Sequence, residues 1–199
     1  MKKADKTKKL IIEKAAQLFN RNGYAGTSMQ NIATEAGVTK GSIYGYNFHD
    51  KEEIALAAFD YNVQLLFGAL WEGVRQASSA KAKLAFYCEF HQKHYQKILD
   101  YGGCPILNCA IDSDDTHNKL NQRVRQALQD WEQKLSDIIR LGIDQKEFKE
   151  ETDSVYYAHL FISLIEGSIM LAKTHKKEVY ILNALQHIAD LIQTIDINH

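Results

Sequence analysis

Residues 27–51 read TSMQNIATEAGVTKGSIYGYNFHDK, and this stretch decides the fold of the N-terminal part of the chain. Thr27-Ser28 offers an N-cap, apolar residues then recur every three or four positions, and Gly37 ends the segment after about two turns. The hydroxyl of Thr39 can cap a second short helix that begins at Lys40. Two short helices joined across a glycine predict a helix-turn-helix, because glycine lets the backbone turn sharply.

The rest of the chain continues this helical pattern. It contains one proline, almost no alternation of period two, and apolar residues at three- and four-residue spacing almost throughout. We therefore predict an all-α fold of about nine helices, with a three-helix domain at residues 1–50 and a larger helical domain at residues 51–199. Besides the two short helices that begin at Met29 and Lys40, the expected helices cover residues 4–22, 50–77, 80–100, 105–111, 117–143, 152–174 and 177–196.

Charge is distributed unevenly along the chain. The formal net charge is only −1, so no overall positive field indicates nucleic acid or an anionic membrane. Residues 1–51, however, hold nine basic and four acidic residues, a local balance of 9 − 4 = +5. Any contact with DNA is therefore expected in this part of the chain.

The cysteines and the hydropathy of the sequence indicate the cellular compartment in which the protein is expected. Cys88, Cys104 and Cys109 are odd in number and lack C-x-x-C spacing, and the N-terminus is rich in lysine without an apolar signal region. A reducing cytoplasm fits these features best. We expect no membrane segment, because no apolar run approaches the roughly 20 residues that span a bilayer.

The N-terminal motif has a specific resemblance that extends beyond the helix-turn-helix. Its residues, in order, are Ala16, Leu18, Phe19, Gly23, Tyr24, Thr27, Ser28, Met29, Ile32, Ala33, Ala36, Gly37, Val38, Thr39, Lys40, Gly41, Ser42, Ile43, Tyr44, Phe48, Lys51 and Glu52. With this order and spacing, about residues 8–60 resemble the N-terminal domain of TetR repressors. The resemblance implies a homodimer that places two third helices in successive major grooves of a palindromic operator. It also implies a transcriptional repressor whose two DNA-binding domains move apart when a ligand binds.

The first turn of the third helix suits contact with DNA. Its free N–H groups and positive dipole end favour a phosphate or a base edge, and Gly41 and Gly45 leave room for close approach. Lys51 resembles the phosphate-contacting lysine of the family. The alternative is that the hydroxyl residues only cap helices and that Tyr44 and Phe48 only pack. The predicted DNA-binding residues are Thr27, Ser28, Thr39, Lys40, Gly41, Ser42, Tyr44, Gly45, Asn47, His49 and Lys51.

One departure from the family pattern occurs after the third helix. The segment Tyr44-Gly45-Tyr46-Asn47-Phe48-His49-Asp50-Lys51 contains one residue more than the family's usual spacing. An extra residue inside a helix rotates all later helix positions by about 100°. A looser turn before the fourth helix can absorb it, with either Tyr46 or Asn47 as the surplus residue.

The last two helices are apolar enough for a dimer seam. Helix 152–174 carries two apolar stripes about 100° apart, and helix 177–196 repeats apolar residues every three or four positions. We expect a four-helix seam between two copies, in agreement with the resemblance; a purely intramolecular core is the alternative. The predicted seam residues are Ile162, Ile165, Ile169, Leu185, Ile188 and Ile192.

Aromatic and polarizable residues concentrate in the middle of the chain, as expected for a pocket that binds a small apolar or aromatic effector. Ordinary core packing is the alternative. The segment Gly102-Gly103-Cys104-Pro105 resembles a turn found in a subset of the family, where ligand binding is coupled to DNA binding. The predicted effector-binding residues are Phe67, Trp71, Phe86, Phe90, His91, Tyr95, Cys104, Leu107, Trp131 and Phe161.

Other functions have weaker support in the sequence. A metal sensor is one alternative, suggested by the spacing of Cys88, His91 and His94, but no further metal ligand is identifiable in another segment. A redox switch is another alternative, suggested by Cys104 and Cys109. We expect neither a metal nor a cofactor. An enzyme is not expected either, because no nucleophile elbow, phosphate loop or H-E-x-x-H pair occurs. A domain that binds another protein stays open. The partners that we expect are operator DNA, a second copy of the chain and an unidentified effector.

Overall fold

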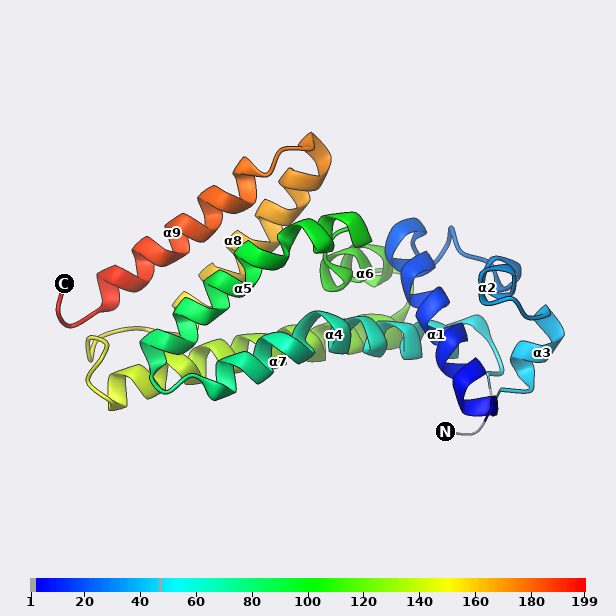
Figure 1. Ribbon diagram of the computed structural model, residues 1–199, viewed down its shortest axis with the longest axis horizontal. Helices are drawn as coiled ribbons and strands as arrows, with labels where there is room; N and C mark the ends of the chain where they lie inside the picture. Colours follow the sequence, from blue (N-terminus) through cyan, green and yellow to red (C-terminus); the bar gives the residue numbers. More distant parts are fainter. Residues whose placement is uncertain (1–2, 47) are drawn as a thin grey trace. The chain divides into compact units, whose positions relative to one another are not determined.

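The computed structural model describes residues 3–46 and 48–199, and the described residues form helices joined by short turns (Figure 1). The all-α prediction is confirmed, and every expected helix is present close to its predicted bounds. In chain order the helices are α1 Lys3–Asn22, α2 Met29–Ala36, α3 Lys40–Tyr44, α4 Lys51–Gln76, α5 Ala80–Tyr101, α6 Pro105–Ser113, α7 Asn118–Asp144, α8 Ser154–His175 and α9 Val179–Ile195.

The chain divides into two compact units. The first unit comprises Met1–Leu66 and Tyr101–Ala127, and the second comprises Phe67–Asp100 and Leu128–His199. Helices α4 and α7 therefore each contribute residues to both units. The boundary predicted at residue 50 differs from the bounds of these packing units, and the division of functions at that residue stays a prediction.

A small apolar core holds α1 to α4 together in the first unit. Every helix of the motif contributes to it, and the connection between α3 and α4 contributes Phe48, which is 3% exposed. Burial of each large side chain of this core stabilises the fold by roughly 1.5–3 kcal/mol. The buried members are Ile11, Ala15, Ala16, Ile32, Ala33, Ala36, Ile43, Phe48, Ile54 and Ala58.

Side-chain caps fix both short helices of the motif. Ser28 is the N-cap of α2: its hydroxyl accepts from the backbone N–H of Asn31, whose side chain in turn accepts from the backbone N–H of Ser28. Thr39 caps α3 in the same way by accepting from the N–H of Ser42. Gly37 ends α2 at φ 65°, in the left-handed region that favours glycine. The predicted caps and the sharp turn are confirmed, with Ser28 rather than Thr27 as the cap of α2.

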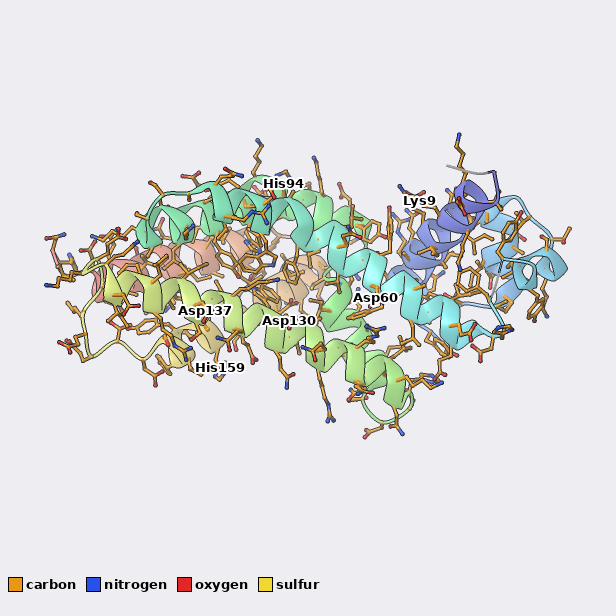
Figure 2. The ribbon with its side chains drawn as sticks, turned by 90° about the horizontal axis from the view of Figure 1, so that it is seen from below. Lys9, Asp60, His94, Asp130, Asp137 and His159 are labelled. Atoms are coloured by element: carbon orange, nitrogen blue, oxygen red, sulfur yellow. The ribbon has the colours of Figure 1, made fainter. Side chains whose placement is uncertain are left out.

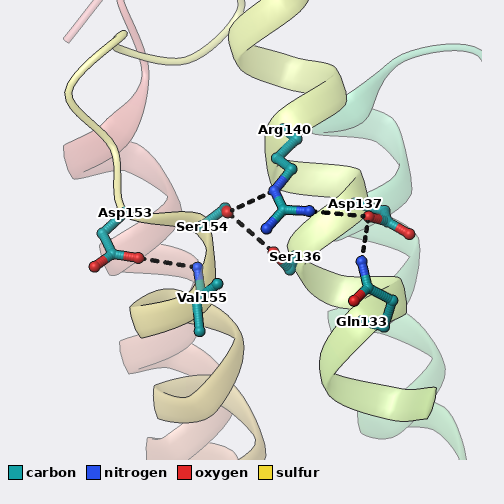
Figure 3. Close-up of polar contacts among 7 residues, drawn as sticks. All are labelled: Gln133, Ser136, Asp137, Arg140, Asp153, Ser154 and Val155. Atoms are coloured by element: carbon teal, nitrogen blue, oxygen red, sulfur yellow. Dashed lines mark hydrogen bonds and ion pairs between the residues drawn. The ribbon is translucent and has the colours of Figure 1, made fainter. Parts of the chain in front are cut away.

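In the second unit, a polar contact between α7 and α8 fixes the start of α8 (Figure 3). The hydroxyls of Ser136 and Ser154 lie 2.9 Å apart, and the Nε of Arg140 donates to the Ser154 hydroxyl at 3.2 Å. Asp153 caps α8 by accepting from two backbone N–H groups of its first turn. Helix α9 then packs beside α8 (Figure 1).

The turn after α7 joins three distant segments of the second unit. Phe148 is 2% exposed and packs directly against Gly142, where an added Cβ atom would lie 2.1 Å from its ring. The backbone N–H of Lys149 donates to the carbonyl of Ile195 at 2.8 Å, and the carboxylate of Glu147 accepts from the N–H of Lys81 at 2.8 Å. This junction therefore connects α5, α7 and the end of α9.

Two helices are more apolar than the sequence analysis expected. Helices α4 and α8 each contain an 18-residue window with a mean hydropathy of 1.3 and 1.4, respectively, which is long and apolar enough to cross a membrane. The expectation of no membrane segment stays a prediction, because the two helices meet this criterion by length and composition only. About two fifths of each window, 39%, is buried within the described residues, and core helices of soluble proteins share this composition.

Candidate nucleic-acid interface and effector site

Helix α3 presents a polar face to solvent. Lys40, Gly41 and Tyr44 are exposed, Tyr44 by 47% of its surface, whereas Ile43 is fully buried. A Cβ atom added at Gly41 would meet nothing within 4 Å, so the backbone there is open to an incoming molecule. The sequence analysis predicted contact with DNA at this face.

The other predicted contacts around α2 and α3 differ in exposure. Ser28, Thr39, Gly45 and His49 are exposed, and Ser42 is half-buried. The Ser42 hydroxyl donates to the carbonyl of Thr39 at 2.7 Å, which leaves its oxygen free only to accept. Capping by Ser28 and Thr39 is observed, and their contact with DNA stays a prediction.

Lys51 and Thr27 lie closer to the interior than predicted. The ammonium of Lys51 donates to the carbonyls of Tyr24 at 3.0 Å and Thr27 at 3.1 Å, and it lies 4.0 Å from the centre of the Tyr24 ring. An ammonium has three donors, so one remains for a phosphate. Thr27 is fully buried, which weakens the prediction that its hydroxyl binds DNA.

The extra residue was predicted to lie in the turn between α3 and α4. Helix α3 ends at Tyr44, and the N–H of Tyr46 donates to the carbonyl of Ile43, which continues the turn. Tyr46 and Phe48 both pack against the core of the first unit. Asn47, a predicted base contact, lies outside the described residues. The looser turn before α4 stays a prediction, and the residue that caps α4 is Asp50, whose carboxylate accepts from the N–H of Glu53 at 2.8 Å.

The turn at Gly102 fastens α6 to the end of α1 within the first unit. Gly102 has φ 118°, and an added Cβ atom would lie 3.1 Å from the side chain of Arg21. The side-chain amide of Asn108 donates to the carbonyls of Asn20 and Gly102 at 3.1 and 2.9 Å, and that of Asn20 donates to the carbonyl of Gly103 at 3.2 Å. We call these contacts of Asn20, Gly102, Gly103 and Asn108 the α1–α6 latch.

A second contact extends the latch to the loop before α2. The carboxylate of Asp112, on α6, accepts from the backbone N–H of Tyr24. Gly23 adopts φ 73° beside this carboxylate, a conformation that a side chain would strain. A cavity of about 30 Å³, room for one or two water molecules, lies between these groups and α4. Helix α6 therefore contacts the end of α1 and the start of the α1–α2 loop through polar groups.

Five aromatic side chains of the second unit form a continuous cluster, which we call the aromatic cluster: Phe67, Trp71, Tyr87, His91 and Trp131. The Phe67 ring lies 5.8 Å from that of Trp71 and 4.8 Å from that of Trp131. Tyr87 lies 6.3 Å from Trp71 and 4.5 Å from His91. The structure thus brings together four of the predicted effector-binding residues.

Tyr87 is the member that the sequence analysis missed. It is fully buried, and it shares one face of α5 with Leu84 and His91, at spacings of three and four residues. That spacing was visible in the sequence and could have identified it.

The other predicted effector-binding residues lie elsewhere or at the edge of the cluster. Phe90 contacts His91 at 6.1 Å, and Phe86 packs on Gly73. The Tyr95 hydroxyl donates to Glu178, away from the cluster, and the buried Phe161 has a ring contact with Tyr157. Cys104 and Leu107 belong to the first unit.

His91 is neutral inside this cluster. Its Nδ1 lies 2.8 Å from the carbonyl oxygen of Tyr87, and because a carbonyl only accepts, Nδ1 carries the proton. Burial lowers the pKa of His91 to about 4. The ring therefore adds no positive charge to the cluster at neutral pH.

The depressed pKa of His91 predicts a loss of stability in acid. Between about pH 6.5 and pH 4 the unfolded chain binds a proton at this residue, whereas the folded chain does not. The free energy of unfolding should fall by about 3 kcal/mol over this interval because of His91 alone. Urea denaturation of the wild type and of His91→Gln at several pH values measures this fall in the free energy of unfolding. If the free energy depended on pH in the same way in both proteins, His91 would not be its cause.

Thiols and acidic groups give little support to redox or metal chemistry. Burial raises the pKa of Cys88 to about 12 and that of Cys109 to about 11, so both thiols stay protonated and unreactive. Within the described residues, no group of three or more His, Cys, Asp or Glu side chains is placed to hold a metal ion. Exposed groups such as Asp130, Asp137 and His159 are spread over helix surfaces (Figure 2).

The residues predicted for the dimer seam lie mostly inside the chain. Ile165 and Ile188 are fully buried, Ile162, Ile169 and Leu185 are at most 7% exposed, and only Ile192 is half-buried. Packing of α8 and α9 within one chain explains this burial. A different set on α8 stays accessible, namely Tyr156, Leu160, Leu164, Gly167 and Leu171, which we call the exposed α8 stripe.

Family models match both parts of the chain. Residues 11–58 match the model described as "Bacterial regulatory proteins, tetR family", and residues 80–188, more than half of the chain, match "Tetracyclin repressor-like, C-terminal domain". The chain belongs to the TetR family. Members of the TetR family are soluble DNA-binding transcriptional regulators and are not enzymes.

Individual TetR-family proteins are similar along almost the whole chain. A TetR-family regulator from Cytophaga hutchinsonii is 37% identical, with a TM-score of 0.90 over 99% of this chain and 98% of its own. One from Chloroflexus aurantiacus is 33% identical, with a TM-score of 0.91 over 98% of both chains. An uncharacterised HTH-type regulator encoded in the lacX 3' region of Lactococcus lactis is 29% identical, over 94% of this chain and 92% of its own.

Proposed function

We propose that the chain is a cytoplasmic repressor that binds a palindromic operator as a homodimer and releases it when a small molecule binds. The observation that carries this proposal is the exposed face of α3, with Lys40, Gly41 and Tyr44 held outward by a capped helix-turn-helix. The balance of +5 over residues 1–51 supports an anionic partner at the same place. In this proposal residues 1–50 bind DNA, and residues 51–199 bind the effector and dimerise.

The exposed α8 stripe supports the homodimer. Tyr156 is 56% and Leu171 36% exposed, although both lie on a helix whose opposite face is the core of the second unit. Exposed apolar side chains aligned along one helix mark an interaction surface. Gly167 has open space where a Cβ atom would project, so a second helix can approach closely there. We therefore assign the seam to this stripe and not to the buried isoleucines.

The α1–α6 latch supports a route for release. Helix α6 is fastened to the end of α1 by Asn20 and Asn108, and to the loop before α2 by Asp112. Any shift of α6 must therefore break these hydrogen bonds or move α1 with it. In this proposal an effector shifts α6 and thereby changes the position of α3.

Binding to the upstream region of its own gene tests the proposal. In an electrophoretic mobility shift assay, a specific operator should bind at least 10³-fold more tightly than random DNA of equal length. Equal affinity for both DNA molecules would contradict the proposal that the chain is a repressor. The operator complex formed by a dimer should also contain two chains per duplex.

Lys40→Ala should weaken operator binding by a factor of about 10² near 0.1 M salt, because the homodimer loses two phosphate contacts, one from each chain. The slope of log affinity against log salt concentration should fall by about two. Mobility shifts at several salt concentrations measure both quantities. Lys97→Ala is the matched control, since Lys97 is an exposed lysine on α5 in the second unit. An equal loss in both variants would contradict a contact at Lys40.

A further inference from the structure

Two buried indole N–H groups in the aromatic cluster have no acceptor. The indole Nε1 atoms of Trp71 and Trp131 are both buried, and neither has a hydrogen-bond partner. Trp131 as a whole is only 1% exposed. Both indole rings contact the ring of Phe67, at centroid distances of 5.8 Å for Trp71 and 4.8 Å for Trp131.

An indole N–H can only donate, so its missing partner must be an acceptor. A buried donor without a partner is destabilising, and native proteins rarely leave one unsatisfied. Here two such donors lie on different helices, Trp71 on α4 and Trp131 on α7. A molecule bound between these helices would satisfy them with its own acceptor.

The surroundings define the charge of that molecule. The rings of the aromatic cluster carry no charge at neutral pH, since the His91 imidazole is neutral there. The ammonium of Lys134 lies 5.2 Å from the Trp71 ring, but Lys134 is exposed. Burial of a carboxylate among uncharged rings is costly, whereas a carbonyl oxygen is a neutral acceptor. A cation would be attracted to the ring faces but would leave both N–H groups unpaired.

We infer that the effector is a neutral apolar molecule with a carbonyl-type oxygen, which accepts hydrogen bonds from the indole N–H groups of Trp71 and Trp131. This inference rests on the proposed function, because it names the ligand class of the proposed effector site. Trp71 and Trp131 then determine specificity by selecting an acceptor. The remaining rings of the cluster supply apolar contact.

The sequence contains two tryptophans, so the two indole N–H signals in a ¹H–¹⁵N spectrum report on these donors directly. The probes are 2-acetylnaphthalene and 2-ethylnaphthalene, which are alike in shape and differ in the carbonyl oxygen. The ketone should move at least one indole proton signal downfield and bind about tenfold more tightly than the hydrocarbon. Failure of the ketone to bind, or equal affinity of both probes, would overturn the inference.

Trp71→Phe and Trp131→Phe each keep an aromatic ring and remove the N–H. The double variant should bind both probes with equal affinity, while its fold, measured by circular dichroism, stays that of the wild type. Tyr180→Phe is the control, because it removes a hydroxyl from a ring that contacts His175 outside the cluster, and the ketone's preference should persist. Persistence of that preference in the double variant would overturn the inference.

Two further probes test the charge. Both 2-naphthoate and (2-naphthylmethyl)trimethylammonium should bind more weakly than the ketone; tighter binding of either one would overturn the neutral-ligand assignment.

Operator binding is measured separately on the same protein. Loss of specific operator binding would remove the proposed function and leave the indole result intact, whereas unshifted indole signals in a protein that binds its operator would remove this inference alone.

Discussion

Changing Leu164 and Leu171 to glutamate should convert a dimer into a folded monomer and weaken operator binding by a factor of about 10² to 10⁴. Both residues lie on the exposed α8 stripe, so glutamate there does not disturb the core of the second unit. Across a two-fold axis the new carboxylates would face their own copies, and like charges in an apolar seam repel. Without the partner, each DNA-binding domain binds a half-site alone, and the increase in affinity that comes from bivalent binding is lost.

Analytical ultracentrifugation measures the oligomeric state, and mobility shift measures operator affinity. Leu65→Glu is the matched control, since Leu65 is a 56% exposed leucine on α4 outside the stripe. The control should remain dimeric. A dimeric double-glutamate variant would contradict the assignment of the seam, and an unfolded one is recognised by circular dichroism. In that case Gly167→Glu, at a position open to solvent, tests the same seam.

Gly142→Ala should lower the free energy of unfolding by about 3 kcal/mol and the Tm by roughly 6–12 °C. The added methyl group would lie 2.1 Å from the ring of Phe148 and 2.9 Å from the Cβ of Ala80. Phe148 is 2% exposed and Ala80 is fully buried, so neither side chain has room to move. The junction of α5, α7 and the end of α9 must therefore separate to relieve the overlap.

Gly68→Ala is the control for this substitution. Gly68 is exposed on α4, and an added Cβ atom there meets nothing within 4 Å. Alanine should stabilise that helix by about 0.5–1 kcal/mol, because glycine is the poorer helix former. Thermal unfolding of both variants gives the comparison, and equal Tm values would show that the junction tolerates the methyl group.

Local signals in the sequence were sufficient to predict the helices and their caps. Ser28, Gly37 and Thr39 act through hydrogen bonds or backbone angles within three or four residues, so the sequence alone indicates their roles. The extra residue after Tyr44 was likewise visible by counting. The packing of Tyr46 and Phe48 against the core of the first unit was not visible by counting.

The faces of α8 could not be assigned from periodicity. Both of its stripes are apolar, and spacing alone does not tell which stripe the chain covers itself. The structure buries Ile165 and Ile169 and leaves Leu164 and Leu171 accessible. Contacts between residues far apart in sequence were also beyond prediction, such as Asn108 on Asn20 and the two carbonyls that accept from Lys51.

The placement of both tryptophans in the second unit has a practical consequence for optical measurements. Their intrinsic fluorescence reports only on that unit, whereas circular dichroism sums over helices of the entire chain. Emission is thus a built-in label for the part that we assign to effector binding, and the helix-turn-helix is silent in it. Denaturation curves followed by tryptophan emission and by circular dichroism therefore distinguish unfolding of the second unit from unfolding of the helix-turn-helix without any added dye.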